Sequence, residues 1–204
     1  MRITQQAKEE NRKKILEIAA RLFSELGFEK TTTRDLSSAM GMAKGTLFNY
    51  FPSKETLAMT MVADAMEDGR ATYINRKTGE ESLTEDMFLL VASELRALKS
   101  FRLYIGPVLE SCMSVFSKNA TCRAGERARK EHLQMVSDIL ATHDYELVPD
   151  SITVTMYWSL YLGILAHWSR DTSDHQQETL ALLDYSMRVF AMMVSGDMPG
   201  YREL

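Results

Sequence analysis

A pair of short helical patterns separated by a glycine, within residues 31–57, constrains the fold of this 204-residue chain more than any other segment. Thr32 is placed to accept a backbone N–H at a helix start, and Asp35 three residues later completes a capping-box pattern. Gly41 ends this first helix, because glycine adopts a left-handed backbone without strain. A second helix is predicted over residues 43–51. Two short helices joined by a tight turn predict a helix-turn-helix unit.

The second helix of this unit has two chemically different faces. Leu47 and Phe51 share one face, and we expect them to pack against the first helix of the domain. Gly45 is a poor helix former, and its presence is explained if the backbone must approach DNA closely there. The opposite face carries residue types that contact bases and phosphates. These residues are Lys44, Thr46, Asn49 and Tyr50.

Helical patterns also flank the unit on both sides. Apolar residues recur at helical spacing over residues 7–26, and Gly27 closes that helix. Pro52 ends the second helix of the unit, and Ser53 caps the long helix that follows. Lys54 stands at the start of that helix, where the helix dipole disfavours a cation unless an anion is bound as well. A DNA phosphate would supply that anion.

Residues 10–57 resemble the N-terminal domain of the TetR family of bacterial transcriptional regulators. The resemblance rests on the run ILEIAARLFSELGFEKTTTRDLS, the turn at Gly41 and the segment GTLFNYFPSKETL. Two positions depart from the commonest pattern: Ala43 stands where Ser or Thr often caps the recognition helix, and Phe48 stands where Tyr is common. Each removes a hydroxyl that could contact phosphate. Resemblance to this family implies a DNA-binding head, a helical C-terminal domain and pairing of two chains through their last two helices.

The charge of the chain is unevenly distributed. The whole chain carries a net charge of -4, which by itself argues against a nucleic-acid-binding protein. Residues 1–54, however, contain ten Lys or Arg against six Asp or Glu, a net +4, whereas residues 55–204 contain 14 against 22, a net -8. A basic head on an acidic body favours contact with phosphate at one end only. Charge alone would leave the matter open, and the helix-turn-helix pattern decides it.

The composition favours an all-α fold in two parts. The chain has only four prolines and ten glycines, and few of its segments alternate between apolar and polar residues. We predict about nine helices, with a three-helix DNA-binding head at residues 1–53 and an effector-binding and dimerisation bundle at residues 54–204. No apolar run approaches about 18 residues, and the N-terminus is too polar for a signal peptide. The sequence therefore predicts a cytoplasmic protein that does not span a membrane.

The predicted body contains one kinked helix and a pair of unusually apolar ones. A helix over residues 101–118 is expected to kink at Gly106 and Pro107, because proline lacks the N–H that continues the helix. Helices over residues 150–170 and 173–194 are apolar on more than one side, so more than one side must be covered. A second copy of the chain would supply that cover in a two-fold four-helix interface.

The resemblance also implies a small-molecule effector site among the aromatic and sulfur-containing residues of the body. An apolar or aromatic effector is expected, although any single one of these residues is more simply explained as part of the core. The candidates are Phe101, Tyr104, Phe116, Met135, Tyr157, Tyr161 and His167. Cys112 and Cys122 are interpreted as free thiols, because no further ligand lies near them for zinc, and no metal or cofactor is predicted.

The function predicted from these patterns is a homodimeric, ligand-responsive regulator, most naturally a repressor that binds double-stranded operator DNA. The DNA-binding residues fall into two groups. Lys44, Gly45, Thr46 and Asn49 would approach bases, and Thr32, Thr33, Tyr50 and Lys54 would hold phosphates. An enzyme is the first alternative, but no catalytic motif points to a reaction. The second alternative is an effector-binding adaptor whose DNA-binding head has decayed, and the exposed polar residues of the head argue against it.

Overall fold

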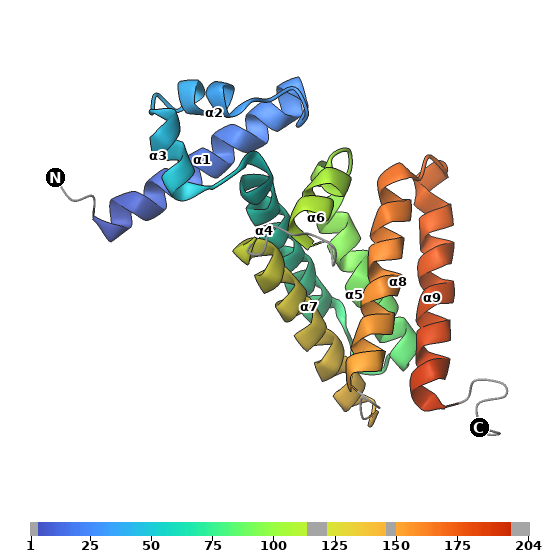
Figure 1. Ribbon diagram of the computed structural model, residues 1–204. Helices are drawn as coiled ribbons and strands as arrows, with labels where there is room; N and C mark the ends of the chain where they lie inside the picture. The colour runs from blue at the N-terminus through green and yellow to red at the C-terminus, as the bar shows by residue number, and fades with distance from the viewer. Residues whose placement is uncertain (1–3, 114–121, 146–149, 197–204) are drawn as a thin grey trace.

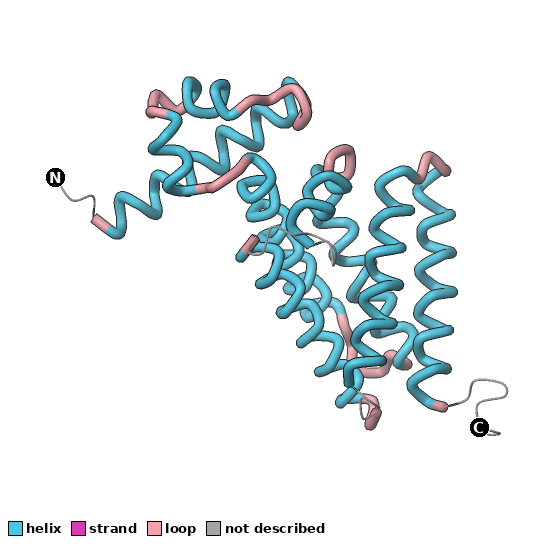
Figure 2. Tube along the Cα trace, in the orientation of Figure 1, coloured by secondary structure: helices cyan, strands magenta, loops and turns pink. Residues whose placement is uncertain are grey.

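The computed structural model describes residues 4–113, 122–145 and 150–196, and within these ranges the chain is helical and contains no strand. The predicted all-α fold is confirmed. Helices make up nearly all of the trace in Figure 2, and short loops join them. Nine α-helices occur in the described part of the chain, together with short 3-10 helices at Leu98–Phe101 and Asp174–Gln176. The α-helices are α1 (Gln5–Leu26), α2 (Thr33–Ala39), α3 (Lys44–Tyr50), α4 (Lys54–Arg76), α5 (Leu83–Ala97), α6 (Ile105–Met113), α7 (Arg123–Thr142), α8 (Asp150–Arg170) and α9 (Gln177–Ser195).

The first three helices form a small head at one end of the molecule (Figure 1). Ile15 and Phe23 of α1 are fully or almost fully buried, and they meet Leu36 of α2 and Leu47 of α3 in the same apolar core. The guanidinium of Arg12 lies over the ring of Phe51 at 4.7 Å, which ties α1 to the end of α3. The apolar faces read from the sequence therefore pack inward and leave the polar faces in solvent.

Helix α4 begins at the head and extends into the body, which is formed by α4 and the remaining helices. Helices α5, α6 and α7 pack along it, and α8 and α9 lie side by side at the far edge of the body (Figure 1). Helices α4 and α5 approach each other closely at Gly69, where a Cβ would lie 2.6 Å from the Cα of Glu94. Only glycine permits this crossing. None of the described helices is long and apolar enough to cross a membrane.

The structure corrects the prediction of a kinked helix over residues 101–118. A 3-10 turn and an irregular segment occupy residues 98–104, and α6 begins only at Ile105. Pro107 therefore lies in the first turn of α6, where its missing N–H would have no partner within the helix, so the helix does not kink there. Residues 114–118 lie outside the described residues.

Candidate nucleic-acid interface

The start of α2 is fixed by hydrogen bonds between two neighbouring side chains. The hydroxyl of Thr32 accepts a hydrogen bond from the Asp35 N–H at 3.2 Å, and the Asp35 carboxylate accepts from the Thr32 N–H at 2.8 Å. The Thr32 hydroxyl also donates to that carboxylate, and this hydroxyl contact is the largest cause that lowers the pKa of Asp35. The capping box expected from the sequence is present, and it orients α2 within the head.

The turn between α2 and α3 depends on Gly41. This residue has φ of +61°, in the left-handed region that other residues avoid. The N–H of Gly41 donates to the carbonyl of Ser38, and the N–H of Met42 donates to the carbonyl of Ser37, each at 3.0 Å. These bonds close the end of α2 and set the angle at which α3 leaves the turn.

Helix α3 presents its polar residues to solvent. Leu47 is 2% exposed and anchors the helix, whereas Phe48 is 37% exposed and receives the Lys44 ammonium over its ring at 5.5 Å. The residues predicted to approach bases all lie on the exposed side of this helix. They are Lys44, Gly45, Thr46 and Asn49. The exposed side of α3 therefore carries residue types that contact bases and phosphates in protein–DNA complexes.

Gly45 has no packing reason to be a glycine. A Cβ built on it would meet no atom within 4 Å, and its φ lies outside the left-handed region. A glycine inside a helix lowers helix stability relative to alanine by about 1 kcal/mol. Packing inside the protein therefore does not require a glycine at this position.

The residues predicted to hold phosphate lie around the same surface with different degrees of exposure. Thr32 is exposed at the cap of α2, and Thr33 is half-buried in its first turn. The hydroxyl of Tyr50 accepts a hydrogen bond from Asn11 of α1 at 3.3 Å. The ammonium of Lys54 donates to the carbonyl of Phe28 at 2.7 Å, which leaves two of its three N–H donors for another partner.

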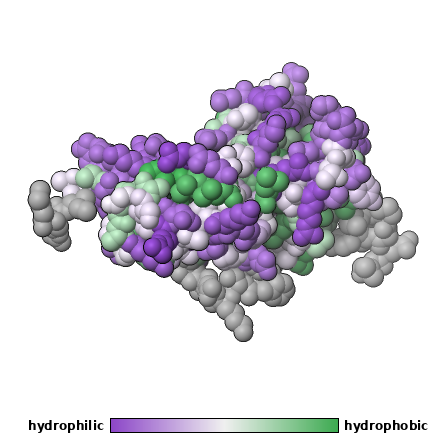
Figure 3. Space-filling model, turned by 90° about the horizontal axis from the view of Figure 1, so that it is seen from above, coloured by the Kyte–Doolittle hydropathy of each residue, from purple (hydrophilic) through white to green (hydrophobic). Residues whose placement is uncertain are grey.

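Seen from above, the molecule is largely hydrophilic, but a band of hydrophobic residues runs across the head toward the body (Figure 3). A groove of about 560 Å³ lies at this junction, and Phe28, Phe101 and Tyr104 line it. The rings of Phe28 and Tyr104 stack with centroids 5.1 Å apart. Two residues predicted to bind an effector thus lie between head and body instead of inside the bundle.

Comparison with known proteins identifies the head and the chain. The signature described as "Bacterial regulatory proteins, tetR family" matches residues 15–59, which cover the second half of α1, all of α2 and α3, and the start of α4. The HTH-type transcriptional repressor Rv1474c of Mycobacterium tuberculosis is 28% identical over 174 residues, covering 85% of this chain and 89% of that protein. The head is a TetR-family DNA-binding domain. The resemblance predicted from the sequence is confirmed, and the protein is a transcriptional regulator similar to the repressors of this family.

Two further comparisons distinguish a similarity confined to a short segment from a similarity over most of the chain. The repressor KstR2 of Rhodococcus jostii is 39% identical over 57 residues, and this match spans only 28% of either protein. The TetR-family repressor FadR of Thermus thermophilus, solved in complex with lauroyl-CoA, superposes with a TM-score of 0.65. It is 18% identical, and the alignment covers 88% of this chain and 93% of that one. The head is thus similar in sequence, whereas the body is similar to FadR in fold.

The body of the protein contains a buried polar network centred on Glu94, which has no exposed surface. Its carboxylate accepts hydrogen bonds from Tyr161 at 2.7 Å and from Arg70 at 3.3 Å. His132 lies 2.9 Å from the same carboxylate through Nδ1, and its Nε2 lies 2.9 Å from the Tyr157 hydroxyl. Burial, followed by the nearby charge of Glu94, raises the pKa of both tyrosines well above the ordinary value. Sequence reasoning did not find Glu94 or Arg70.

The effector residues predicted from the sequence do not meet in one cavity. Tyr157 and Tyr161 belong to the Glu94 network, whereas Phe101 and Tyr104 lie at the head. Met135 is half-buried against the core, and Phe116 lies outside the described residues. The predicted set is therefore dispersed over the body. A charged residue inside the apolar run of α5 was the one signal in the sequence that could have pointed to Glu94.

His167 belongs to a separate group with Asp171 and Glu178, whose potential ligand atoms lie within 4.8 Å of one another. The Nε2 atom of His167 has no hydrogen-bond partner among the described residues. Asp171, however, already accepts four hydrogen bonds, two each from Ser173 and Thr179. Its carboxylate serves to join α8 to α9, and a metal ion would have to compete with those bonds.

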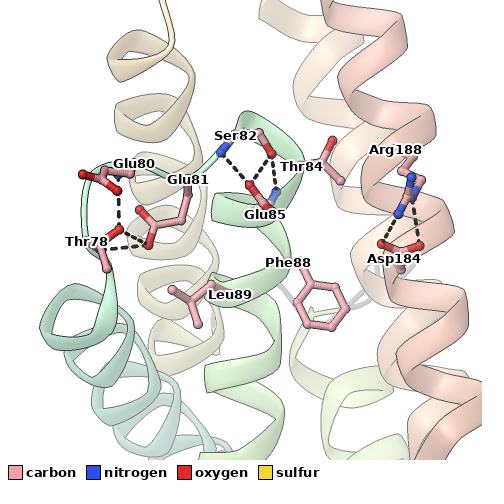
Figure 4. Close-up of a pocket in the computed structure, with 10 residues that line it drawn as sticks. All are labelled: Thr78, Glu80, Glu81, Ser82, Thr84, Glu85, Phe88, Leu89, Asp184 and Arg188. Carbon is pink, nitrogen blue, oxygen red and sulfur yellow. Dashed lines mark hydrogen bonds and ion pairs between the residues drawn. The ribbon is translucent and has the colours of Figure 1, made fainter.

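A groove of about 770 Å³ opens between the loop after α4 and helix α9 (Figure 4). Glu81 accepts hydrogen bonds from the backbone of Thr78 and Gly79, which lower its pKa to about 2. Asp184 pairs with Arg188 one turn later in α9 at 2.8 Å. These charged groups are bonded to their own neighbours and do not converge on a ligand. The groove therefore has the features of an open surface more than those of a binding site.

Proposed function

We propose that two copies of this TetR-family regulator bind a palindromic operator and repress transcription until a small molecule binds the body. The observation that carries the proposal is the exposed polar face of α3, which includes a glycine that packing does not require. A head that had lost DNA binding would have no reason to keep that glycine, because alanine is favoured in a helix. This favours the regulator over an adaptor with a decayed head.

In this proposal, the DNA-binding domain ends at residue 53, and the effector-binding and dimerisation domain begins at residue 54. The base-approaching residues are Lys44, Gly45, Thr46 and Asn49, and the phosphate-holding residues are Thr32, Thr33, Tyr50 and Lys54. A recognition helix in a major groove contacts base edges with its first residues, and the residues around it contact the backbone. The protein would work in the cytoplasm, where the DNA of a bacterium lies, and it would catalyse no reaction.

Apolar side chains on α8 and α9 support the homodimer. These helices form the far edge of the body, with no described helix beyond them (Figure 1). Several of their large apolar residues are exposed, which is costly for a monomer in water. They are Ile152, Met156, Leu180, Tyr185 and Met192. Pairing through this face would place two α3 helices on one side of the dimer, where they could read successive major grooves about 34 Å apart.

A groove of about 570 Å³ between α6 and α8 supports the effector site. Its lining is mainly apolar, with Leu109 and Met113 of α6 and Leu162 and Leu165 of α8. The same lining contains one cation, Arg170, and one carboxylate, Glu110. The structural neighbour FadR was solved with lauroyl-CoA, an anionic molecule with a long apolar chain. A molecule of this chemistry would suit both the apolar lining and the arginine.

The test of this proposal combines mass and release measurements. Light scattering should give twice the chain mass for the wild-type protein, and Tyr185→Asp should give a monomer, because a charge there would be buried at the interface. Lauroyl-CoA should release a bound operator fragment, and Leu165→Trp, which fills the groove, should prevent the release. A monomeric wild-type protein would contradict the dimer, and release that is equally strong in Leu165→Trp would contradict this effector site.

A further inference from the structure

Two cysteines meet where α6 and α7 come together. Cys112 lies near the end of α6, and Cys122 is the residue before the first turn of α7. Cys112 lies against the first turn of α7, where a Cβ on Gly125 would come within 3.4 Å of the Cys112 Cβ, and the interaction of the two thiols raises the pKa of Cys112 and lowers that of Cys122. Cys122 is 8% exposed and Cys112 is half-buried. Both residues are free thiols.

The backbone around the pair is unusually close. A Cβ added to Gly125 would lie 2.4 Å from the carbonyl oxygen of Cys112, so the first turn of α7 packs directly on the backbone of α6. The N–H groups of Ala124 and Gly125, at the start of α7, face the Cys122 sulfur. The interaction with Cys112, followed by these N–H groups, lowers the pKa of Cys122, whereas Cys112 keeps its proton. Helix N-termini favour thiolates in this way.

The pair also lies against the connection between body and head. The side chain of Thr56, in the first turn of α4, interacts with the Cys122 thiol. Ala124 lines a groove together with Thr56 and with Tyr50 and Phe51 of the head. Helices α6 and α7 both pack along α4, which carries the head (Figure 1). A change in the distance between the two sulfurs would therefore act on the first turn of α4.

We propose that Cys112 and Cys122 are a redox site, oxidised by a hydroperoxide to an intrachain disulfide that weakens operator binding. The Cys122 thiolate attacks the terminal oxygen of the hydroperoxide, so that an S–O bond forms, the O–O bond breaks, and the alkoxide leaves as an alcohol after taking a proton. The thiol of Cys112 then attacks the Cys122 sulfur. The S–S bond forms, the S–O bond breaks, and hydroxide leaves with the Cys112 proton as water. Two thiols lose two electrons and the hydroperoxide gains them.

The regulatory half of this inference rests on the proposed function. A disulfide holds its sulfurs about 2 Å apart, closer than two hydrogen-bonded thiols. Closing that distance pulls the end of α6 and the start of α7 together against Thr56, and α4 must shift to accommodate them. The two heads of the dimer would then no longer match the spacing of the operator grooves. Coupling of this kind changes affinity by about tenfold.

The chemical half is tested on the full-length protein with hydrogen peroxide as the oxidant. Intact mass spectrometry should show a loss of two hydrogens per chain, and both thiols should resist N-ethylmaleimide until dithiothreitol is added. Cys112→Ser should stop at the sulfenic acid of Cys122, which dimedone traps, and Cys122→Ser should leave Cys112 a thiol. An unchanged mass, a disulfide between chains on a non-reducing gel, or Cys122→Ser that is oxidised as fast as the wild type would overturn the pair.

The effect of oxidation on DNA binding is tested with an operator fragment that the reduced protein has selected. Peroxide should weaken binding by about tenfold, dithiothreitol should restore it, and the double variant with serine at both positions should bind equally before and after peroxide. Equal binding by the reduced and oxidised wild type would overturn the switch and leave the redox pair standing. If the reduced protein selects no DNA at all, the proposed function fails and the switch fails with it, while the mass measurement still decides the redox pair.

Discussion

The head and the body of this protein use polar side chains in opposite ways. In the head, polar groups are exposed on α3, and the hydrogen bonds that shape α2 join residues three positions apart, as between Thr32 and Asp35. In the body, charged groups are buried, and Glu94 bonds to partners 24 to 67 residues away in the sequence. Packing does not need the polar surface of the head, whereas the body depends on its polar core.

This difference separates two kinds of substitution. Changing an exposed residue of α3 should alter DNA binding and leave folding intact, because such residues make few contacts within the chain. Changing the buried network should lower stability first, and it should affect DNA binding only through the loss of folded protein. Each prediction that follows tests whether this separation holds.

The largest expected effect is in the body. Glu94→Ala removes the buried carboxylate that bonds to Tyr161, Arg70 and His132, and the loss of one partner by each of these buried groups costs about 3 kcal/mol or more in total. Arg70 keeps its ion pair with Glu131 at 2.6 Å. The free energy of unfolding, measured with urea at fixed protein concentration, should fall by that amount. Glu67→Ala, an exposed glutamate of α4, is the matched control and should change it by less than about 0.5 kcal/mol. Similar values for the two variants would show that the network does not stabilise the body.

The next effect separates DNA binding from stability in the head. Gly45→Ala should raise the stability of α3 by about 1 kcal/mol, because a Cβ there meets nothing. The same change should weaken operator binding by about tenfold if the backbone approaches a base closely. Gly106→Ala, in the first turn of α6, also adds a Cβ in open space and should leave binding unchanged. Operator affinity that is unaffected by Gly45→Ala would remove the main support for the proposed reading surface.

A smaller effect is expected at the cap of α2. Thr32→Ala removes both the acceptor for the Asp35 N–H and the donor to its carboxylate, and should cost about 1 kcal/mol. Thr32→Ser keeps both bonds and should lose little. Because these bonds lower the pKa of Asp35, the contribution of the cap is present above the ordinary carboxylate pKa, and is lost as the pH falls through the lowered value. Equal urea midpoints for the Ala and Ser variants would argue against the cap.

The smallest effect concerns salt. Lys54→Ala should weaken binding to every DNA sequence alike and reduce the slope of log affinity against log salt by about one unit per head. Thr46→Ala is the informative contrast, since it should change which sequence is preferred and leave the slope unchanged. Titrations at several salt concentrations measure both. An unchanged slope for Lys54→Ala would mean that this lysine bonds to Phe28 but does not contact a phosphate.

The same contrast explains what could be predicted from the sequence. Local residues determine the helices of the head, the capping box at Thr32 and the turn at Gly41. The geometry of these features can therefore be predicted from the residue types alone. The network around Glu94 depends on residues brought together from four helices, and no local pattern shows which partners will meet. The same limit applies to Phe101 and Tyr104, which were predicted for an effector site: Tyr104 stacks on Phe28 of the head, and Phe101 packs against Tyr104.

Helix α6 shows a second kind of limit. Its start depends on the 3-10 turn before it, which brings Leu98 into the core and holds Arg102 against the carbonyl of Trp168. This contact joins segments 66 residues apart, so no local pattern in the sequence shows it. The position of Pro107 was read correctly as incompatible with the middle of a straight helix. It was read wrongly as a kink, because the sequence did not show that the helix starts there.

The most direct test of the account is binding to the DNA just upstream of the protein's own gene, titrated at several salt concentrations. A scrambled fragment of equal length is the control, and Gly45→Ala is measured beside the wild type. The account predicts tight, salt-sensitive binding that prefers the upstream fragment, and a weaker preference in the variant at undiminished stability. If the upstream fragment binds no better than the scrambled one, the site lies elsewhere, and selection from genomic fragments must find it. No sequence-selective binding in that selection, even at low salt, would contradict the central claim that the exposed face of α3 reads DNA.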